Sequence, residues 1–257
     1  MGLCNGRLPV ENRLTVRYGI CGKLMLFVLF VAISGNHGRL ASKGGLVIFG
    51  VEPIASVYFM SFSTSRELTI LKLDLSAKAK NGINFILAAI IVWSLVTVVW
   101  TLPYTTNTKA IFTFIIGSLL LPLAWLFSRL LGTSWTIPDN PLQPLGLWLN
   151  LAQLLYFPIL IFVFLRHVDY FLLVYVVITG AHFFPYSWFY STRSYAVMAG
   201  LISVGTMLLG LYTRPEQAFL MPALLVGCLV ILVIWNVADY RKSAQLYQAA
   251  LNGQSTP

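Results

Sequence analysis

Few side chains in this sequence could take part in chemistry, and the most notable ones lie inside long apolar runs. Asn150 and Gln153 are three residues apart, so on a helix they share one face. His182 lies in the next apolar run and carries an imidazole that can take up a proton near neutral pH. Two amides and an imidazole can bind a polar solute, or they can hydrogen-bond across helices and only hold the bundle together.

These groups are expected to lie at similar depth in neighbouring helices. Counting 1.5 Å per residue places Gln153 and His182 each about 12 Å inside the same end of its run. The predicted polar pocket consists of His182, Gln153, Asn150 and Ser187. Proline interrupts helical hydrogen bonding, and the expected helix kinks are at Pro122, Pro158 and Pro185. Alternatively, His182 is neutral and serves only in packing.

Other site chemistry has no support in the sequence. No Asp or Glu lies within the predicted spans, and no Ser-His-Asp set, phosphate-binding glycine loop or metal-ligand cluster is present. The three cysteines, Cys4, Cys21 and Cys228, lack the spacing of a metal site. We therefore predict no catalytic residues, no cofactor and no metal, and we expect that the protein is not an enzyme.

The composition indicates which elements must position the polar groups. Of 257 residues, 58% are hydrophobic and 10% are charged, which excludes a water-soluble globule of ordinary composition. The predicted fold class is all-α, a polytopic transmembrane bundle of six spans, each about as long as a bilayer requires. The predicted spans are Asn84 to Leu102, Ala110 to Leu131, Leu145 to Leu165, Tyr170 to Tyr190, Tyr195 to Tyr212 and Phe219 to Val237.

The net charge of +9 predicts orientation rather than nucleic-acid binding. Eight lysines and arginines flank the ends that share a side with the C-terminus, against three on the other side. This asymmetry predicts a cell-membrane protein with a cytoplasmic tail at residues 239–257 and contacts with anionic lipid at the inner face. The expected interfacial anchors are Trp125, Arg129, Trp188 and Arg193.

The first 82 residues divide into two parts. Residues 60–82 contain a capping-box pattern at Thr64 to Glu67 and leucines at helical spacing, which predicts an amphipathic helix on the inner surface, or else a basic tail without structure. Residues 1–59 hold two short apolar stretches. Three interpretations are open for them: a cleaved signal peptide, a poorly inserted hydrophobic hairpin, or an extension ahead of a start at Met60. The last interpretation is favoured.

Four sequence blocks carry a family resemblance. They are Lys80-Asn81-Gly82 leading into FILAAIIVW, Leu121 to Trp125 with Ser128-Arg129, Asn150 to Tyr156, and Gly180 to Trp188. From about Leu71 to Ala199 the chain resembles an uncharacterised family of small bacterial multi-pass membrane proteins, known only as a domain of unknown function. The resemblance implies a fold class and no chemistry.

The first four spans contain an internal echo. Pro122, Trp125 and Ser128 recur as Pro185, Trp188 and Ser191 at a constant offset of 63 residues. The echo indicates two related hairpins of the kind found in transporters, or convergence between interfacial helix ends.

Two functions fit these patterns. The first is a small-solute permease or channel-like protein with its pocket near His182. The second is a non-transporting membrane anchor, sensor or partner-binding module. Six spans are few for a complete transporter, so a homodimer is consistent with either function.

Overall fold

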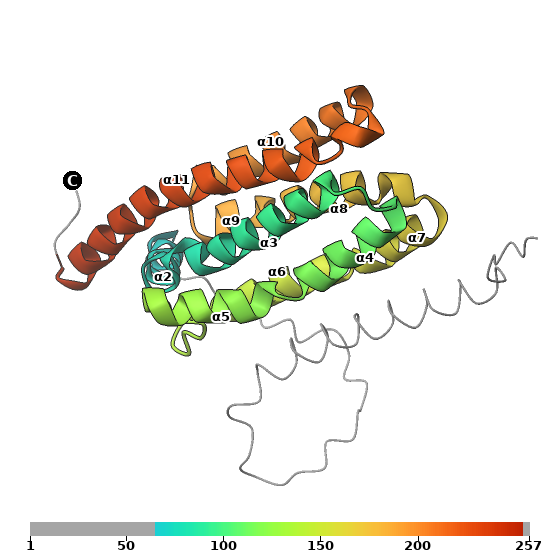
Figure 1. The fold of residues 1–257 in the computed structure, drawn as a ribbon. Coiled ribbons are helices and arrows are strands. Elements are labelled where there is room, and N and C mark those ends of the chain that lie inside the picture. Colours follow the sequence, from blue (N-terminus) through green and yellow to red (C-terminus); the bar gives the residue numbers. More distant parts are fainter. Residues whose placement is uncertain (1–64, 254–257) are drawn as a thin grey trace, which may run out of the picture.

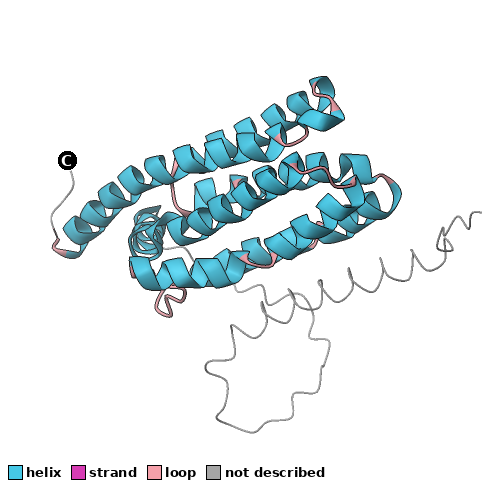
Figure 2. Cartoon of the chain, in the orientation of Figure 1, coloured by secondary structure: helices cyan, strands magenta, loops and turns pink. Residues whose placement is uncertain are grey.

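The computed structural model describes residues 65–253. The expectations for residues 1–59 and for residues 60–64 lie outside the described residues. Within residues 65–253 the regular secondary structure is helical, with no strand, and six helical runs are long and apolar enough to cross a membrane (Figures 1 and 2). The predicted all-α bundle of six spans is confirmed.

The spans agree with the apolar runs because a bilayer requires long stretches without charge. In chain order they are α3 (Ile83–Thr101); α4 (Thr106–Gly117) with α5 (Leu120–Leu131); α6 (Gln143–Leu154) with α7 (Phe157–Arg166); η2 (Val168–Tyr170), α8 (Phe171–His182) and α9 (Phe184–Phe189); α10 (Arg193–Tyr212); and η3 (Pro215–Gln217) with α11 (Leu220–Leu251). The sequence placed the end of the sixth span at Val237, whereas α11 continues as one helix to Leu251.

The spans are packed unevenly. The helices α3, α10 and α11 are unbroken and contact one another through α11, with α8 packed on α10 and α5 packed on α3. In the first span, half of the most apolar window is buried inside the bundle, and in the third span 11% is buried. The third span, α6 with α7, is therefore the most loosely held part of the bundle.

A further helix, α2 (Ser65–Ala79), crosses one end of the bundle. Figure 1 looks nearly along α2, whereas the spanning helices run across the view. The change of direction occurs at η1 (Lys80–Gly82), where three successive residues have positive φ angles of 49°, 51° and 68°. Asn and Gly tolerate this left-handed conformation better than other residues, which explains why Asn81-Gly82 ends the helix.

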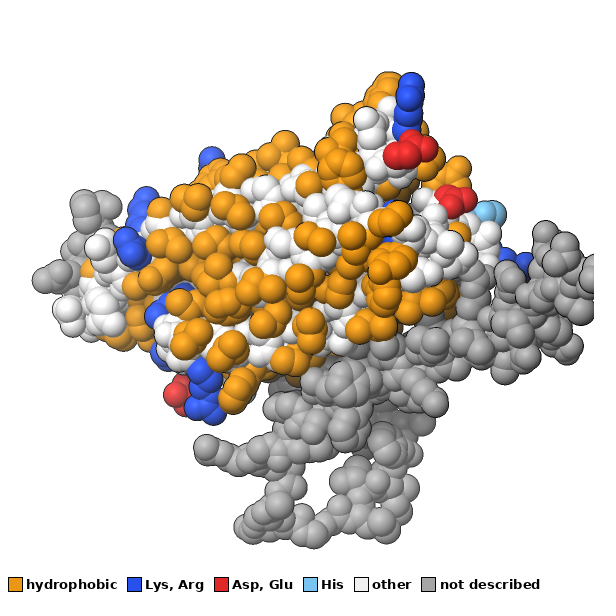
Figure 3. Space-filling model, viewed as in Figure 1, with side chains coloured by type: hydrophobic (Ala, Val, Ile, Leu, Met, Phe, Trp, Pro, Cys, Tyr) orange, Lys and Arg blue, Asp and Glu red, His pale blue; other side chains and the backbone are white. Residues whose placement is uncertain are grey.

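The surface is divided into an apolar band and charged ends, as Figure 3 shows for one face. We call the end that carries α2 the basic end. The lysines and arginines of the helices at this end are Lys72, Lys78, Lys80, Arg129, Arg193, Arg241 and Lys242. An apolar band between polar ends is the surface expected of a protein that spans a bilayer.

Candidate functional site

Three of the six spans are broken inside the bundle. The second span is broken between α4 and α5, the third between α6 and α7, and the fourth between α8 and α9. Each break precedes a proline by a few residues, at Pro122, Pro158 and Pro185. Proline lacks an N–H group, so the carbonyl four residues earlier loses its helical donor.

The backbone at each break is held by shorter turns. The backbone N–H groups of Leu119, Tyr156 and Phe183 donate to the carbonyls three residues earlier, at 3.0, 3.1 and 3.1 Å. Carbonyls at membrane depth need partners in the protein or in water. The breaks therefore leave polar backbone inside three consecutive spans.

The third and fourth spans are in register near the basic end. Gly146 in α6 lies against Phe189 in α9, because a Cβ atom at Gly146 would be 3.0 Å from Phe189 Cζ. Gln153 lies seven residues further into α6, and His182 lies seven residues back from Phe189. At about 1.5 Å per residue, both are about 10 Å from that contact. The two antiparallel spans thus bring Gln153 and His182 to the same level.

Each residue of the predicted pocket has its own surroundings. His182 is half-buried at the end of α8, and its Nε2 atom lies 3.4 Å from the Tyr186 hydroxyl. Gln153 is half-buried. Asn150 is exposed, and its side-chain amide donates to Gly146 O in its own helix at 2.9 Å. Ser187 donates to a backbone carbonyl in the α9–α10 connection, that of residue 192, at 2.7 Å.

The structure therefore brings some of these residues together and separates others. Gln153 and His182 share a level, and Asn150 lies one turn closer to the basic end. Ser187 is bonded to the chain segment that follows α9. Within residues 65–253, the side-chain hydrogen bonds of His182 and Asn150 go to their own spans and do not join the two helices. The pocket stays a prediction. Its members belong to α6 and to α8–α9, and the path that we propose between these helices is called the cleft below.

A second polar group, which the sequence analysis missed, lies beside this cleft at the basic end. Asn81 is fully buried in η1, where its side-chain oxygen accepts from Ser76 Oγ at 2.6 Å and its carbonyl accepts from the Tyr195 hydroxyl at 2.5 Å. In α10 and α11, Ser194 Oγ donates to Asn236 Oδ1 at 2.6 Å. We call Ser76, Asn81, Ser194, Tyr195 and Asn236 the buried polar network.

The buried polar network ties the α2–α3 turn to the last two spans. The side-chain nitrogens of Asn81 and Asn236 are enclosed and have no hydrogen-bond partner, so the network is not fully satisfied. Asn81 and Tyr195 are 114 residues apart. No local pattern could have joined them.

Stacked tyrosines connect the cleft with this network. The Tyr186 ring, next to His182, stacks on Tyr190 at a centroid distance of 6.1 Å, and Tyr190 stacks on Tyr195 at 5.9 Å. The absence of a side chain at Gly82 gives the tyrosine hydroxyls room. The groups with hydrogen-bonding capacity thus form a continuous neighbourhood from His182 towards the basic end.

The model of a family of unknown function (DUF7010) matches residues 68–239, which is more than half of the chain. The chain belongs to this family. The resemblance inferred from residues 71–199 is confirmed, and the match extends through the sixth span. No curated protein and no solved structure matches the sequence.

The family membership and the six apolar helices identify an integral membrane protein, and the anchor residues fit the basic end. Trp125 is exposed on α5, and the Arg129 guanidinium lies 5.2 Å from its ring centre. Trp188 is exposed on α9, and Lys72 Nζ lies 3.6 Å from its ring centre. Arg193 is exposed at the first residue of α10. Exposed Trp side chains paired with cations are typical of a membrane interface.

The half of the bundle away from the basic end contains an aromatic cluster instead of a polar cleft. Phe114 contacts four other aromatic rings, with centroid distances from 5.0 to 6.4 Å. These rings belong to Phe157, Phe164, Phe171 and Tyr175. With Phe114, these rings come from α4, α7 and α8, so the cluster joins the second, third and fourth spans.

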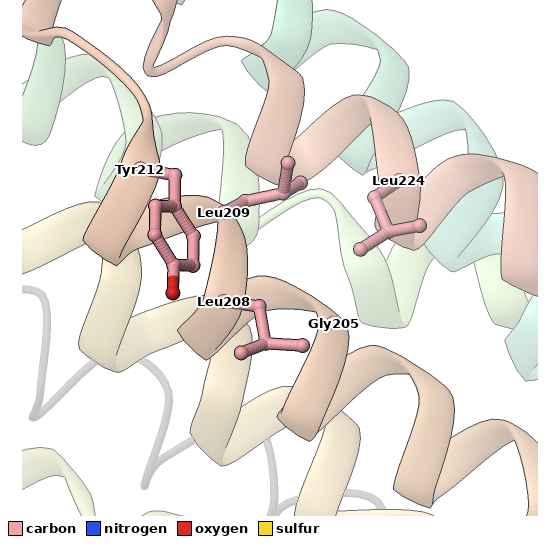
Figure 4. A pocket seen from close by; sticks show the side chains of 5 residues that line it. All are labelled: Gly205, Leu208, Leu209, Tyr212 and Leu224. Atoms are coloured by element: carbon pink, nitrogen blue, oxygen red, sulfur yellow. The ribbon is translucent and has the colours of Figure 1, made fainter.

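A shallow groove lies between α10 and α11 (Figure 4). Its lining residues are Gly205, Leu208, Leu209, Tyr212 and Leu224. Four of these five residues have no polar side-chain atom, so the groove fits apolar material. Among residues 65–253, no three His, Cys, Asp or Glu side chains gather as a metal site would require.

Proposed function

We propose that the protein is a small-solute permease or channel-like protein. The observation that carries the proposal is the common level of Gln153 and His182, each close to a break in its span. Transporter sites are typically built from discontinuous helices near the middle of the membrane. The solute path would enter the cleft between α6 and α8–α9 from the basic end.

The chemistry of the cleft fits a small neutral solute or a weak acid in its neutral form. The imidazole of His182, the amides of Gln153 and Asn150, and the Tyr186 hydroxyl offer donors and acceptors. None of these groups carries a fixed charge. A neutral imidazole that takes up a proton at lower pH would couple solute movement to protons.

The proposal also includes an orientation. The basic end is the inner end, so the C-terminus is cytoplasmic and the exposed lysines and arginines contact anionic lipid. Reporter fusions to the C-terminus test this orientation. Reporter activity on the outer side of the cell membrane would overturn it.

The flux experiment uses purified full-length protein in proteoliposomes. Shrink–swell light scattering follows the entry of urea, glycerol and acetic acid, and a trapped pH dye follows protons. We expect wild type to exceed empty vesicles for at least one solute, and His182→Ala and Gln153→Ala to lose most of that excess. Leu155→Ala is the matched control, because Leu155 lies in the same span and is 77% exposed.

The result that contradicts the permease is equally concrete. Wild-type traces that match empty vesicles for every probe, with correctly folded protein, would overturn the proposal. Loss of flux in Leu155→Ala as large as that in His182→Ala would also contradict a role of the cleft.

A second candidate is a non-transporting anchor, sensor or partner-binding module. The aromatic cluster around Phe114 favours it, because a bundle closed at one half has no continuous path. The apolar groove at Gly205 offers a surface to a partner helix, a second copy of the chain included. Neither candidate assigns a catalytic step to the protein.

A further inference from the structure

The helix α2 is tied to the chain segment that leads into α6. The Asn140 side-chain nitrogen donates to Leu71 O at 2.8 Å and to Asp74 Oδ2 at 2.9 Å, and its oxygen accepts from the Leu142 N–H at 3.0 Å. Asn140 is 2% exposed, so water does not compete for these bonds. Because Leu142 directly precedes α6, one side chain joins the middle of α2 to the start of the third span.

The same turn of α2 contacts the end of α9. The Lys72 ammonium lies 3.6 Å from the centre of the Trp188 ring, a distance at which a cation is attracted to the ring. Lys72 itself is 9% exposed. Residues 71–74 therefore hold the fourth span as well as the third.

These two contacts lie at the basic end of the cleft. The walls of the cleft there are α6 and α9, which meet at Gly146 and Phe189. One turn of α2 joins both walls, from Asn140 on one side to Trp188 on the other. In this arrangement α2 lies across the mouth through which the cleft would open to the basic side.

The helix α2 is packed more firmly against the bundle than α6 is. The inner face of α2 is buried, with Leu75 and Ser76 at 2% and 1% exposure, and α2 packs on α11. Its C-terminal end is fixed by η1 and by Lys80 Nζ, which donates to Leu131 O at 2.5 Å. By contrast, α6 has no buried residue. Opening would therefore move α6 away from α2, and few packed contacts would be lost.

We propose that α2 closes the basic mouth of the cleft, and that Asn140 is the positioning residue that latches α6 to it. The inference rests on the proposed function, since a closed mouth matters only if the cleft admits a solute. It predicts that access to Gln153 from the basic end is limited by the Asn140 bonds.

Thiol labelling tests the latch without measuring flux. The reporter is Gln153→Cys in the full chain, with Cys4, Cys21 and Cys228 replaced by alanine. A membrane-impermeant maleimide is added to each side of membrane vesicles in turn. We expect slow labelling in the parent, and labelling about tenfold faster from the basic side when Asn140→Ala is added, because both hydrogen bonds from Asn140 to α2 are lost.

Further variants distinguish the latch from general loosening. Asn140→Asp should also accelerate labelling, because it sets a second carboxylate against Asp74. Asp74→Asn keeps an acceptor for Asn140 and should label at the parental rate. Gln143→Ala is the matched control, since Gln143 is bonded to Trp135 O at 3.5 Å rather than to α2. A reporter at Val204→Cys, on the lipid-exposed face of α10, should stay unlabelled in every variant.

Three outcomes would overturn the latch. They are equal labelling rates in the parent and in both Asn140 variants, rapid labelling of the parent itself, and faster labelling of Val204→Cys together with Gln153→Cys. Solute flux by wild type combined with any of these results would retain the permease and reject the latch. Accelerated labelling without flux in any variant would retain the moving mouth and reject the permease.

Discussion

Gly82→Ala should destabilise the protein for two separable reasons. Gly82 has a φ of 68°, a left-handed conformation that an L side chain rarely adopts. An added Cβ would lie 3.3 Å from the Tyr190 hydroxyl and 3.4 Å from the Tyr195 hydroxyl, so both tyrosines would have to shift by a few tenths of an ångström. The Tyr195 hydroxyl donates to Asn81 O, which limits its freedom to shift.

The magnitude follows from these two effects. The left-handed conformation costs an alanine about 1–2 kcal/mol. Crowding inside a packed site adds about 1 kcal/mol, the low end for overpacking. The expected loss of unfolding free energy is about 2–3 kcal/mol, which lowers Tm by about 4–12 °C for a chain of this size.

Two other glycines separate the effects. Gly132 has a φ of 61° but nothing within 4 Å of an added Cβ, so Gly132→Ala should show the conformational cost alone, about 1–2 kcal/mol. Gly200 lies inside α10 and is equally open, so Gly200→Ala should gain about 0.5–1 kcal/mol. From most to least stable, the predicted order is Gly200→Ala, wild type, Gly132→Ala and Gly82→Ala.

The assay is thermal unfolding in detergent, followed by size-exclusion chromatography of a fluorescent fusion. Equal Tm values for Gly82→Ala and Gly132→Ala would refute the contact with the tyrosines. A Tm of Gly132→Ala at or above that of wild type would refute the conformational argument.

The same assay checks two further predictions. Tyr195→Phe should lower the unfolding free energy by about 1–2 kcal/mol, because the buried Asn81 carbonyl loses its donor. Tyr212→Phe is the control and should leave stability unchanged, since Tyr212 is 84% exposed. Equal effects of the two substitutions would contradict the buried polar network. Phe114→Ala should lower the unfolding free energy by about 3–5 kcal/mol, because it opens a cavity among aromatic rings. Phe162→Ala is the control and should lower it far less, since Phe162 is exposed on α7. A small loss for Phe114→Ala would show that the aromatic cluster is not a packed core.

Features with a local physical cause could be predicted from the sequence. The first span was expected at Asn84 to Leu102 and is found at Ile83–Thr101, because the bilayer demands an uncharged stretch of that length. The kinks expected at Pro122, Pro158 and Pro185 also have a local cause, because a missing N–H affects hydrogen bonding within one turn. Each of the three lies in the first turn of a helix that follows a break.

Features that depend on distant partners could not be predicted. The Lys72 ammonium lies over the ring of Trp188, 116 residues further along the chain, and no local pattern joins these two residues. Asn81 acquires its role only from Tyr195, 114 residues away. Hydropathy also could not extend α11 to Leu251, because the residues beyond Val237 include charged and polar side chains, and α11 packs on α2. Periodicity reports a residue's own helix face and nothing about what covers it.

The uneven packing of the spans bears on how the candidate site could change its access. A wall that moves must give up few buried contacts, and the third span has the smallest buried share of the six, at 11%. That span also supplies Gln153 and Asn150, and it faces the span that carries His182. The opposite wall belongs to the firmly packed set through the α8–α10 contact. Polar groups on one loosely packed and one firmly packed helix are the arrangement in which a site could change its access while its helices stay folded, and Asn140 bonds the start of the loosely packed span to α2.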